Sequence, residues 1–131
     1  KGAFMRNLTL LTDLYELTMM QGYFKTGNNR TVIFDAFHRN NLAAADMPLH
    51  EMIQPERGIG LDQVIDYIKN LHFTDDDIAY LSSLNLFDND FLDYLKNFHF
   101  TGDIYAIPEG TLIFPREPIV KVIAPIIEAQ L

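Results

Sequence analysis

Apolar residues recur at helical spacing near the start of the chain, directly after a helix-start signal. Thr12 or Asp13 can cap the first backbone N–H groups, and Asp13 with Glu16 has the spacing of a capping box. The predicted buried stripe of this helix consists of Leu10, Leu14, Leu17 and Phe24. A Gly-Asn-Asn turn at residues 27–29 ends the helix.

After this turn, the side chains follow the two-residue alternation that is typical of a strand. Residues 31–37 are rich in β-branched and aromatic side chains and predict a strand, in which Asp35 interrupts one face. His38 and Arg39 follow at the strand end, where functional side chains often lie. Residues 40–60 contain two prolines that prevent a long helix, so their structure is left open.

Three short amphipathic helices are predicted between residues 61 and 98. The second begins at a capping box formed by Thr74 and Asp77, and Asp88 caps the third. Their apolar faces are Leu61, Val64, Ile65 and Ile68; Ile78 and Leu81; and Phe91, Leu92, Leu95 and Phe98. The linkers between them are short, so we expect neighbouring helices to fold back on each other.

From residue 101 the pattern indicates β structure. A strand is predicted at residues 103–107, and residues 111–114 are predicted to pair with residues 119–123 across a Pro-Arg-Glu-Pro turn. Together these elements predict an α+β domain over residues 1–124, with helices packed on a mostly antiparallel sheet. Residues 125–131 read as the start of a further helix. Because a helix that stops after one turn has no partner for its apolar face, we expect a longer protein.

Composition narrows the function classes. The 131 residues suit one domain, and a net charge of −8 with a pI of about 4.7 argues against nucleic-acid binding. No run approaches the roughly 18 apolar residues of a membrane span, and no signal peptide is visible, so a cytoplasmic location is expected by default. The lack of cysteine excludes disulfides, thiolate catalysis and cysteine-ligated zinc.

No complete catalytic constellation or metal site is predicted. The four histidines are far apart, and the one conceivable metal cluster is Asp46, His50 and Glu51 in the unreadable segment. Acidic residues gather at 75–77 and 88–93, where they complement helix dipoles.

Two residues could bind a ligand. Tyr15 lies off the buried stripe in a capped first turn, which suits a flat anionic ring, although a half-buried structural aromatic is the alternative. The guanidinium of Arg39 could bind phosphate bidentately, although a surface arginine is the alternative.

Residues 12–19 (TDLYELTM) resemble the N-terminal motif of nicotinate phosphoribosyltransferases, and residues 100–110 and 114–118 resemble a second stretch of that family. Residues 60–68 and 84–92 fit the same pattern, in the same order. Residues 40–60 depart from it, because they lack the glycine-rich turn and apolar strand that the family carries there.

This resemblance implies the N-terminal domain of a type II phosphoribosyltransferase, whose α/β barrel would follow Leu131. Such enzymes join nicotinate and phosphoribosyl pyrophosphate to give nicotinate mononucleotide, with ATP hydrolysis and magnesium, in NAD salvage. It implies substrate binding by Tyr15, Asp13 and Arg39, with Tyr15 stacking on nicotinate, and a homodimer in which that tyrosine reaches the neighbouring barrel. The catalytic groups and the sites for ATP and magnesium would lie on the barrel, so the chain alone is expected to be inactive.

Two alternatives stay open at this point. The β segment at residues 103–123 could belong to a non-catalytic protein-interaction module. A nicotinamide or quinolinate phosphoribosyltransferase shares the same plan, because residues elsewhere largely set the ring specificity.

Overall fold

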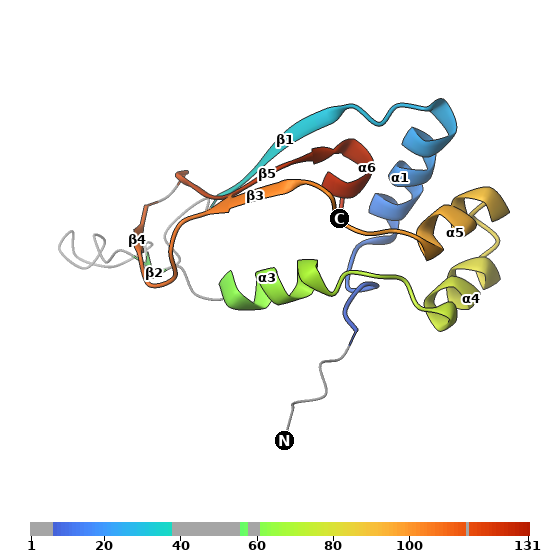
Figure 1. The fold of residues 1–131 in the computed structure, drawn as a ribbon, viewed down its shortest axis with the longest axis horizontal. Helices are drawn as coiled ribbons and strands as arrows, with labels where there is room; N and C mark the ends of the chain where they lie inside the picture. Colours follow the sequence, from blue (N-terminus) through green and yellow to red (C-terminus); the bar gives the residue numbers. More distant parts are fainter. Residues whose placement is uncertain (1–6, 38–55, 58–60, 115) are drawn as a thin grey trace, which may run out of the picture.

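The computed structural model describes residues 7–37, 56–57, 61–114 and 116–131. Its helices are α1 (Leu14–Thr26), α3 (Leu61–Lys69), α4 (Asp75–Ser83), α5 (Asn89–Lys96) and α6 (Ile126–Ala129). Its strands are β1 (Thr31–Phe37), β2 (Glu56–Arg57), β3 (Asp103–Ala106), β4 (Leu112–Ile113) and β5 (Pro118–Pro125). Helices α1, α4, α5 and α6 gather at one end of the main sheet, and the β2–β4 pair lies at the other end (Figure 1). This is the predicted α+β architecture.

The main sheet has the order β1-β5-β3, and both pairings are antiparallel. Thr31 lies opposite Pro125 in one pairing, and Asp103 lies opposite Ile123 in the other. The predicted pairing of residues 111–114 with 119–123 is wrong. A strand has only two hydrogen-bonding edges, and β1 and β3 occupy both edges of β5. The short strand β4 pairs instead with β2.

The hydrophobic core lies among the helices and reaches the α6 end of the sheet. Phe91, Leu95 and Met20 are fully buried there. The ring of Phe91 lies 5.7 Å from that of Phe24 on α1 and 5.9 Å from that of Phe87. The apolar faces predicted for α4 and α5 are confirmed, since Ile78, Leu81, Phe91, Leu92, Leu95 and Phe98 are all buried.

The predicted stripe of α1 is only partly right. Leu17 and Met20 are buried and Phe24 packs against the core, whereas 47% of the surface of Leu14 is exposed. Spacings of three and four residues fit more than one set of positions on a helix. The core covers the side of α1 that carries Leu17 and Met20, and Leu14 projects away from it.

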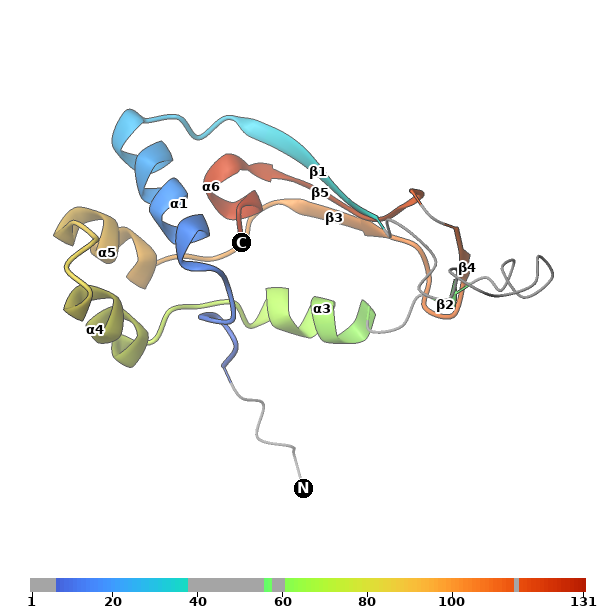
Figure 2. The ribbon, with the colours of Figure 1, turned by 180° about the vertical axis from the view of Figure 1, so that it is seen from behind.

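Helices α4 and α5 fold back on each other as predicted. Helix α3 does not fold back on α4, so this part of the prediction is wrong. Helix α3 runs away from α4 beneath the sheet in both views (Figures 1 and 2). The linker after α3 is extended because Leu71 and Phe73 are themselves buried in the core. The hydroxyl of Thr9 holds this linker by donating to the His72 carbonyl at 2.7 Å. No residue of α3 is buried.

The start of β3 is fixed against α6. The buried carboxylate of Glu128 accepts the Thr101 backbone N–H at 2.6 Å and the Thr101 hydroxyl at 2.8 Å. At the neighbouring Gly102, a Cβ atom would lie 2.6 Å from the Ile123 carbonyl oxygen and would collide with the Ala124 side chain. This close approach therefore requires glycine.

Candidate functional site

The first turn of α1 is built by the predicted capping box. Asp13 is the N-cap in an extended conformation, with φ −78° and ψ 142°. The carboxylate of Glu16 accepts the Asp13 backbone N–H at 3.1 Å and also the Thr12 hydroxyl. Since Glu16 holds two groups from the preceding residues, the chain enters α1 along a fixed path.

Tyr15 and Asp13 lie together at this helix start, and both are exposed. The exposed fraction of Tyr15 is 58%. Leu11 and Met19 are also exposed, and Met19 is one helical turn after Tyr15 on the same side. The ring of Tyr15 is therefore accessible to a ligand or partner, and its role in ring binding stays a prediction.

An open hollow of about 380 Å³ lies beside these residues, between the start of α1 and Leu131. Asp13 lines it and Tyr15 does not. Figure 1 shows the same closeness, with the C-terminus beside the first turn of α1. Residues far apart in the sequence thus meet at the predicted site.

The charge of the hollow constrains its ligand. Its charged lining residues are Asp13 and Glu16, whereas the N-terminus of a helix supplies only about half a positive charge. These two carboxylates disfavour an anion, against the expectation from the helix dipole alone. A nicotinate carboxylate would require a cation from outside the hollow.

Several predicted residues cannot be placed. Arg39 and its neighbour His38 lie outside the described residues, and so do Asp46, His50 and Glu51 of the conceivable metal cluster. The phosphate-binding role of Arg39 stays a prediction.

Acidic residues of both clusters lie in first helical turns, as predicted: residues 75–77 in α4 and Asp90 in α5. Asp77 closes the capping box of α4 with Thr74, and the Asp90 carboxylate accepts the Phe91 N–H at 2.9 Å. Within the described ranges, no three histidine, aspartate or glutamate side chains form a group that could hold a metal. None of the described helices is long and apolar enough to cross a membrane.

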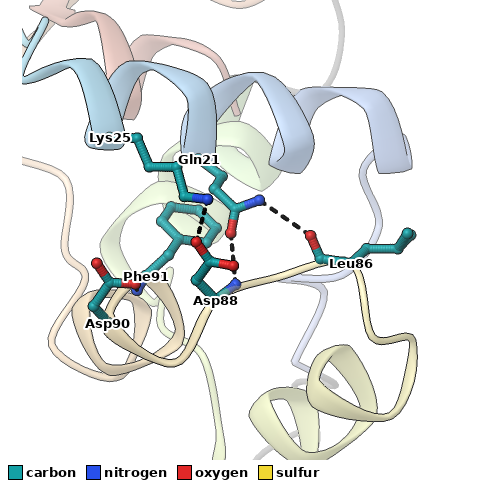
Figure 3. Close-up of polar contacts among 6 residues, drawn as sticks. All are labelled: Gln21, Lys25, Leu86, Asp88, Asp90 and Phe91. Atoms are coloured by element: carbon teal, nitrogen blue, oxygen red, sulfur yellow. Dashed lines mark hydrogen bonds and ion pairs between the residues drawn. The ribbon is translucent and has the colours of Figure 1, made fainter.

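Sequence reasoning missed a polar contact between α1 and the linker that precedes α5 (Figure 3). The Gln21 side-chain amide donates to the Leu86 carbonyl at 3.1 Å and accepts the Asp88 N–H at 2.7 Å. The Lys25 ammonium forms an ion pair with the Asp88 carboxylate. No local signal could have found this contact, because its partners are more than 60 residues away in the sequence.

A second hollow, of about 310 Å³, lies between the N-terminal segment and α3. Asn7, Leu8, Tyr67 and His72 are among its lining residues. Burial, and secondarily the charge of Glu16, raise the pKa of the Tyr67 phenol above its ordinary value. The predicted motifs pointed to none of these residues as a site.

The fold and the helix start define the class of this protein. An antiparallel β1-β5-β3 sheet carries helices at one end, and a capped first helix exposes Tyr15 and Asp13 beside Leu131. A family model for the nicotinate phosphoribosyltransferase (NAPRTase) N-terminal domain matches residues 10–131. The chain belongs to this family.

Proteins similar to this chain are named nicotinate phosphoribosyltransferases. Nicotinate phosphoribosyltransferase pncB2 of Mycobacterium tuberculosis is 41% identical over 126 residues, covering 93% of this chain and 25% of the relative. The Bacillus subtilis nicotinate phosphoribosyltransferase is 42% identical over 130 residues, covering 95% and 24%. The crystal structure of human nicotinic acid phosphoribosyltransferase matches with a TM-score of 0.70 and 26% identity, covering 91% of this chain and 23% of that one. The chain thus spans about a quarter of the length of these relatives.

Proposed function

We propose that this chain is the N-terminal part of an enzyme that joins nicotinate to phosphoribosyl pyrophosphate. The products are nicotinate mononucleotide and pyrophosphate, with coupled ATP hydrolysis and magnesium on the phosphates, in NAD salvage in the cytoplasm. Family membership over residues 10–131 and the names of the relatives support this proposal. The observation that carries the role of this part is the exposure of Tyr15 beside Asp13 on a capped helix start.

In this proposal the domain orients the substrate. Tyr15 stacks on the nicotinate ring and holds its nitrogen towards the anomeric carbon of the ribose as pyrophosphate leaves. Asp13 shapes the same pocket, and Arg39 binds phosphate. Because Asp13 and Glu16 are both acidic, the cation that pairs with the nicotinate carboxylate comes from Arg39 or from the remainder of the longer protein.

We further propose that the enzyme is a homodimer that covers the exposed side of α1. Leu11, Leu14, Tyr15 and Met19 are exposed on consecutive turns, which is a large apolar area for one helix start. A second copy whose barrel receives Tyr15 would bury this area. Sedimentation of the full-length protein tests the dimer, and the Met19→Glu variant should shift it towards the monomer.

Steady-state kinetics of the full-length protein test the role of Tyr15. We expect Tyr15→Ala to raise the KM for nicotinate about 3- to 10-fold, since an aromatic stacking pair contributes about 0.5–1.5 kcal/mol. Tyr15→Phe keeps the ring and should retain most of the affinity. Tyr80→Ala is the matched control, because Tyr80 on α4 has a similar exposed fraction of 57%.

An unchanged KM for nicotinate in Tyr15→Ala would refute the stacking role. Turnover with nicotinamide or quinolinate in place of nicotinate would change the assigned ring specificity. The 131-residue chain by itself should show no turnover.

A further inference from the structure

Helix α1 packs on the core along one side and leaves another side exposed. Leu17 and Met20 are buried, and the ring of Phe24 lies 5.7 and 5.0 Å from the rings of Phe91 and Tyr94. Leu14 and Tyr15 are exposed in the first turn. The direction in which Tyr15 projects therefore depends on how the rest of α1 is held.

Gln21 makes polar contacts that tie α1 to a distant segment of the chain. Figure 3 shows its side chain bridging from α1 to the linker between α4 and α5. The amide reaches two backbone groups of that linker at once, the Leu86 carbonyl at 3.1 Å and the Asp88 N–H at 2.7 Å. Lys25 adds an ion pair to the Asp88 side chain, one helical turn further along α1. Two successive turns of α1 are thus tied to one short segment.

The chemistry of the amide explains why glutamine suits this position. Its NH₂ group donates to a carbonyl while its oxygen accepts from an N–H, whereas the ionised carboxylate of glutamate, which has the same length, can only accept. The Asp88 N–H belongs to the N-cap of α5, one of the helix-start donors that lack a partner within the helix. Gln21 therefore also completes the start of α5, the helix that carries the central Phe91.

We propose that Gln21 is a positioning residue, which sets the direction of α1 and thereby places Tyr15 and Asp13 in the active site of the full-length enzyme. This inference rests on the proposed function. Gln21 lies six positions after Tyr15, about 9 Å along the helix axis. A tilt of about 6° over that length moves the ring by about 1 Å, enough to weaken a stacking contact whose whole contribution is about 0.5–1.5 kcal/mol.

The first test compares Gln21→Met with Ile78→Val in the full-length protein. Met keeps the length of the side chain but loses both hydrogen bonds, and Ile78→Val removes one buried methyl from α4 without touching the Gln21 contact. Both variants should lower the melting temperature by a few degrees. We expect Gln21→Met to raise the KM for nicotinate about 3- to 10-fold, and Ile78→Val to leave it unchanged. Equal KM values in the two variants would overturn the proposal.

A double-mutant cycle separates positioning from a merely structural role. In the Tyr15→Ala background, Gln21→Met should no longer change the KM for nicotinate, because the group that it positions is gone. Independent, additive effects would overturn the proposal. If Gln21→Met does not fold, Gln21→Glu serves in the same cycle, since it keeps the acceptor for the Asp88 N–H but presents a carboxylate to the Leu86 carbonyl.

The same measurements distinguish the two levels of inference. If Tyr15→Ala leaves nicotinate affinity unchanged, the role of Tyr15 in the proposed function fails, and the positioning role fails with it. If Tyr15→Ala weakens affinity while Gln21→Met does not, only the positioning role is refuted.

Discussion

Helices α5 and α3 are similar in sequence pattern and opposite in packing. Both are short, both have an apolar face at helical spacing, and both carry an acidic residue in the first turn and a lysine in the last turn. Helix α5 buries Phe91, Leu92 and Leu95, whereas α3 buries no residue. In Figure 2, α5 lies within the group of helices and α3 extends away beneath the sheet.

The difference teaches that periodicity identifies an apolar face but not what covers it. Helix α5 is covered because Phe24 of α1 and Phe87 before α5 contact Phe91. Helix α3 precedes an extended linker whose own Leu71 and Phe73 occupy the core.

Truncating one residue in each helix should give the largest contrast. We expect Phe91→Ala to lower the free energy of unfolding by about 3–5 kcal/mol, because it removes a fully buried ring. Ile65→Ala in α3 should cost about 1 kcal/mol or less, since partial burial gives only part of the hydrophobic contribution. Urea unfolding followed by circular dichroism measures both values. Similar losses in the two variants would show that α3 packs as tightly as α5.

Removing the polar contact between α6 and the start of β3 should lower the free energy of unfolding by a smaller amount. Glu128→Ala should lower the free energy of unfolding by about 1–3 kcal/mol, because the Thr101 N–H loses its acceptor. Asp66→Ala on the exposed side of α3 is the control and should stay within about 0.5 kcal/mol. Amide exchange at Thr101 gives a local readout, and unchanged protection in Glu128→Ala would contradict the expected role of this carboxylate.

The smallest expected effect is on the pH dependence of stability, and it involves one tyrosine from each helix, Tyr67 of α3 and Tyr94 of α5. Burial raises the pKa of both phenols above the ordinary value of 10.0, with a further contribution from Glu16 at Tyr67 and from Glu128 at Tyr94. A folded-state pKa above the unfolded one means that the folded protein binds the proton more tightly. The contribution to stability is complete below about pH 10 and is lost as the pH rises through the folded-state pKa.

Urea midpoints measured from pH 8 to 11 check this expectation. Stability should fall in the alkaline range, and Tyr67→Phe and Tyr94→Phe should each reduce the fall, because phenylalanine does not titrate. The exposed Lys96 acts in the same direction, since its bond to Asp93 raises its pKa, so each variant is compared with the unmodified protein. Identical pH profiles for all three proteins would refute the role of burial at these two rings.

Short-range signals predicted most of the elements. Thr74 with Asp77 forms the predicted capping box, and β1 spans the predicted residues 31–37. The α+β class and the family also follow from the order of the elements and from the motif at residues 12–19. These features depend on neighbouring residues, whose side chains and backbone interact within one or two turns.

The candidate site was predictable only in part. Tyr15 and Asp13 lie together because they are two residues apart, and any helix start would bring them close. The closeness of Leu131, the two carboxylates of the hollow and the Gln21 contact depend on residues distant in sequence. Arg39, outside the described residues, stays a prediction from the sequence alone.

The sequence by itself determined where most of the helices and strands lie, the apolar faces of α4 and α5, and the family to which the chain belongs. The tertiary structure alone decided that β5 pairs with β1 and β3, that α5 is covered and α3 is not, and that Gln21 contacts the linker between α4 and α5. The physical reason is range. Helix capping and hydrophobic periodicity depend on residues that are close in the sequence. Which helix face packs on which, and which strand edges pair, depends on all the apolar faces and strand edges of the folded chain.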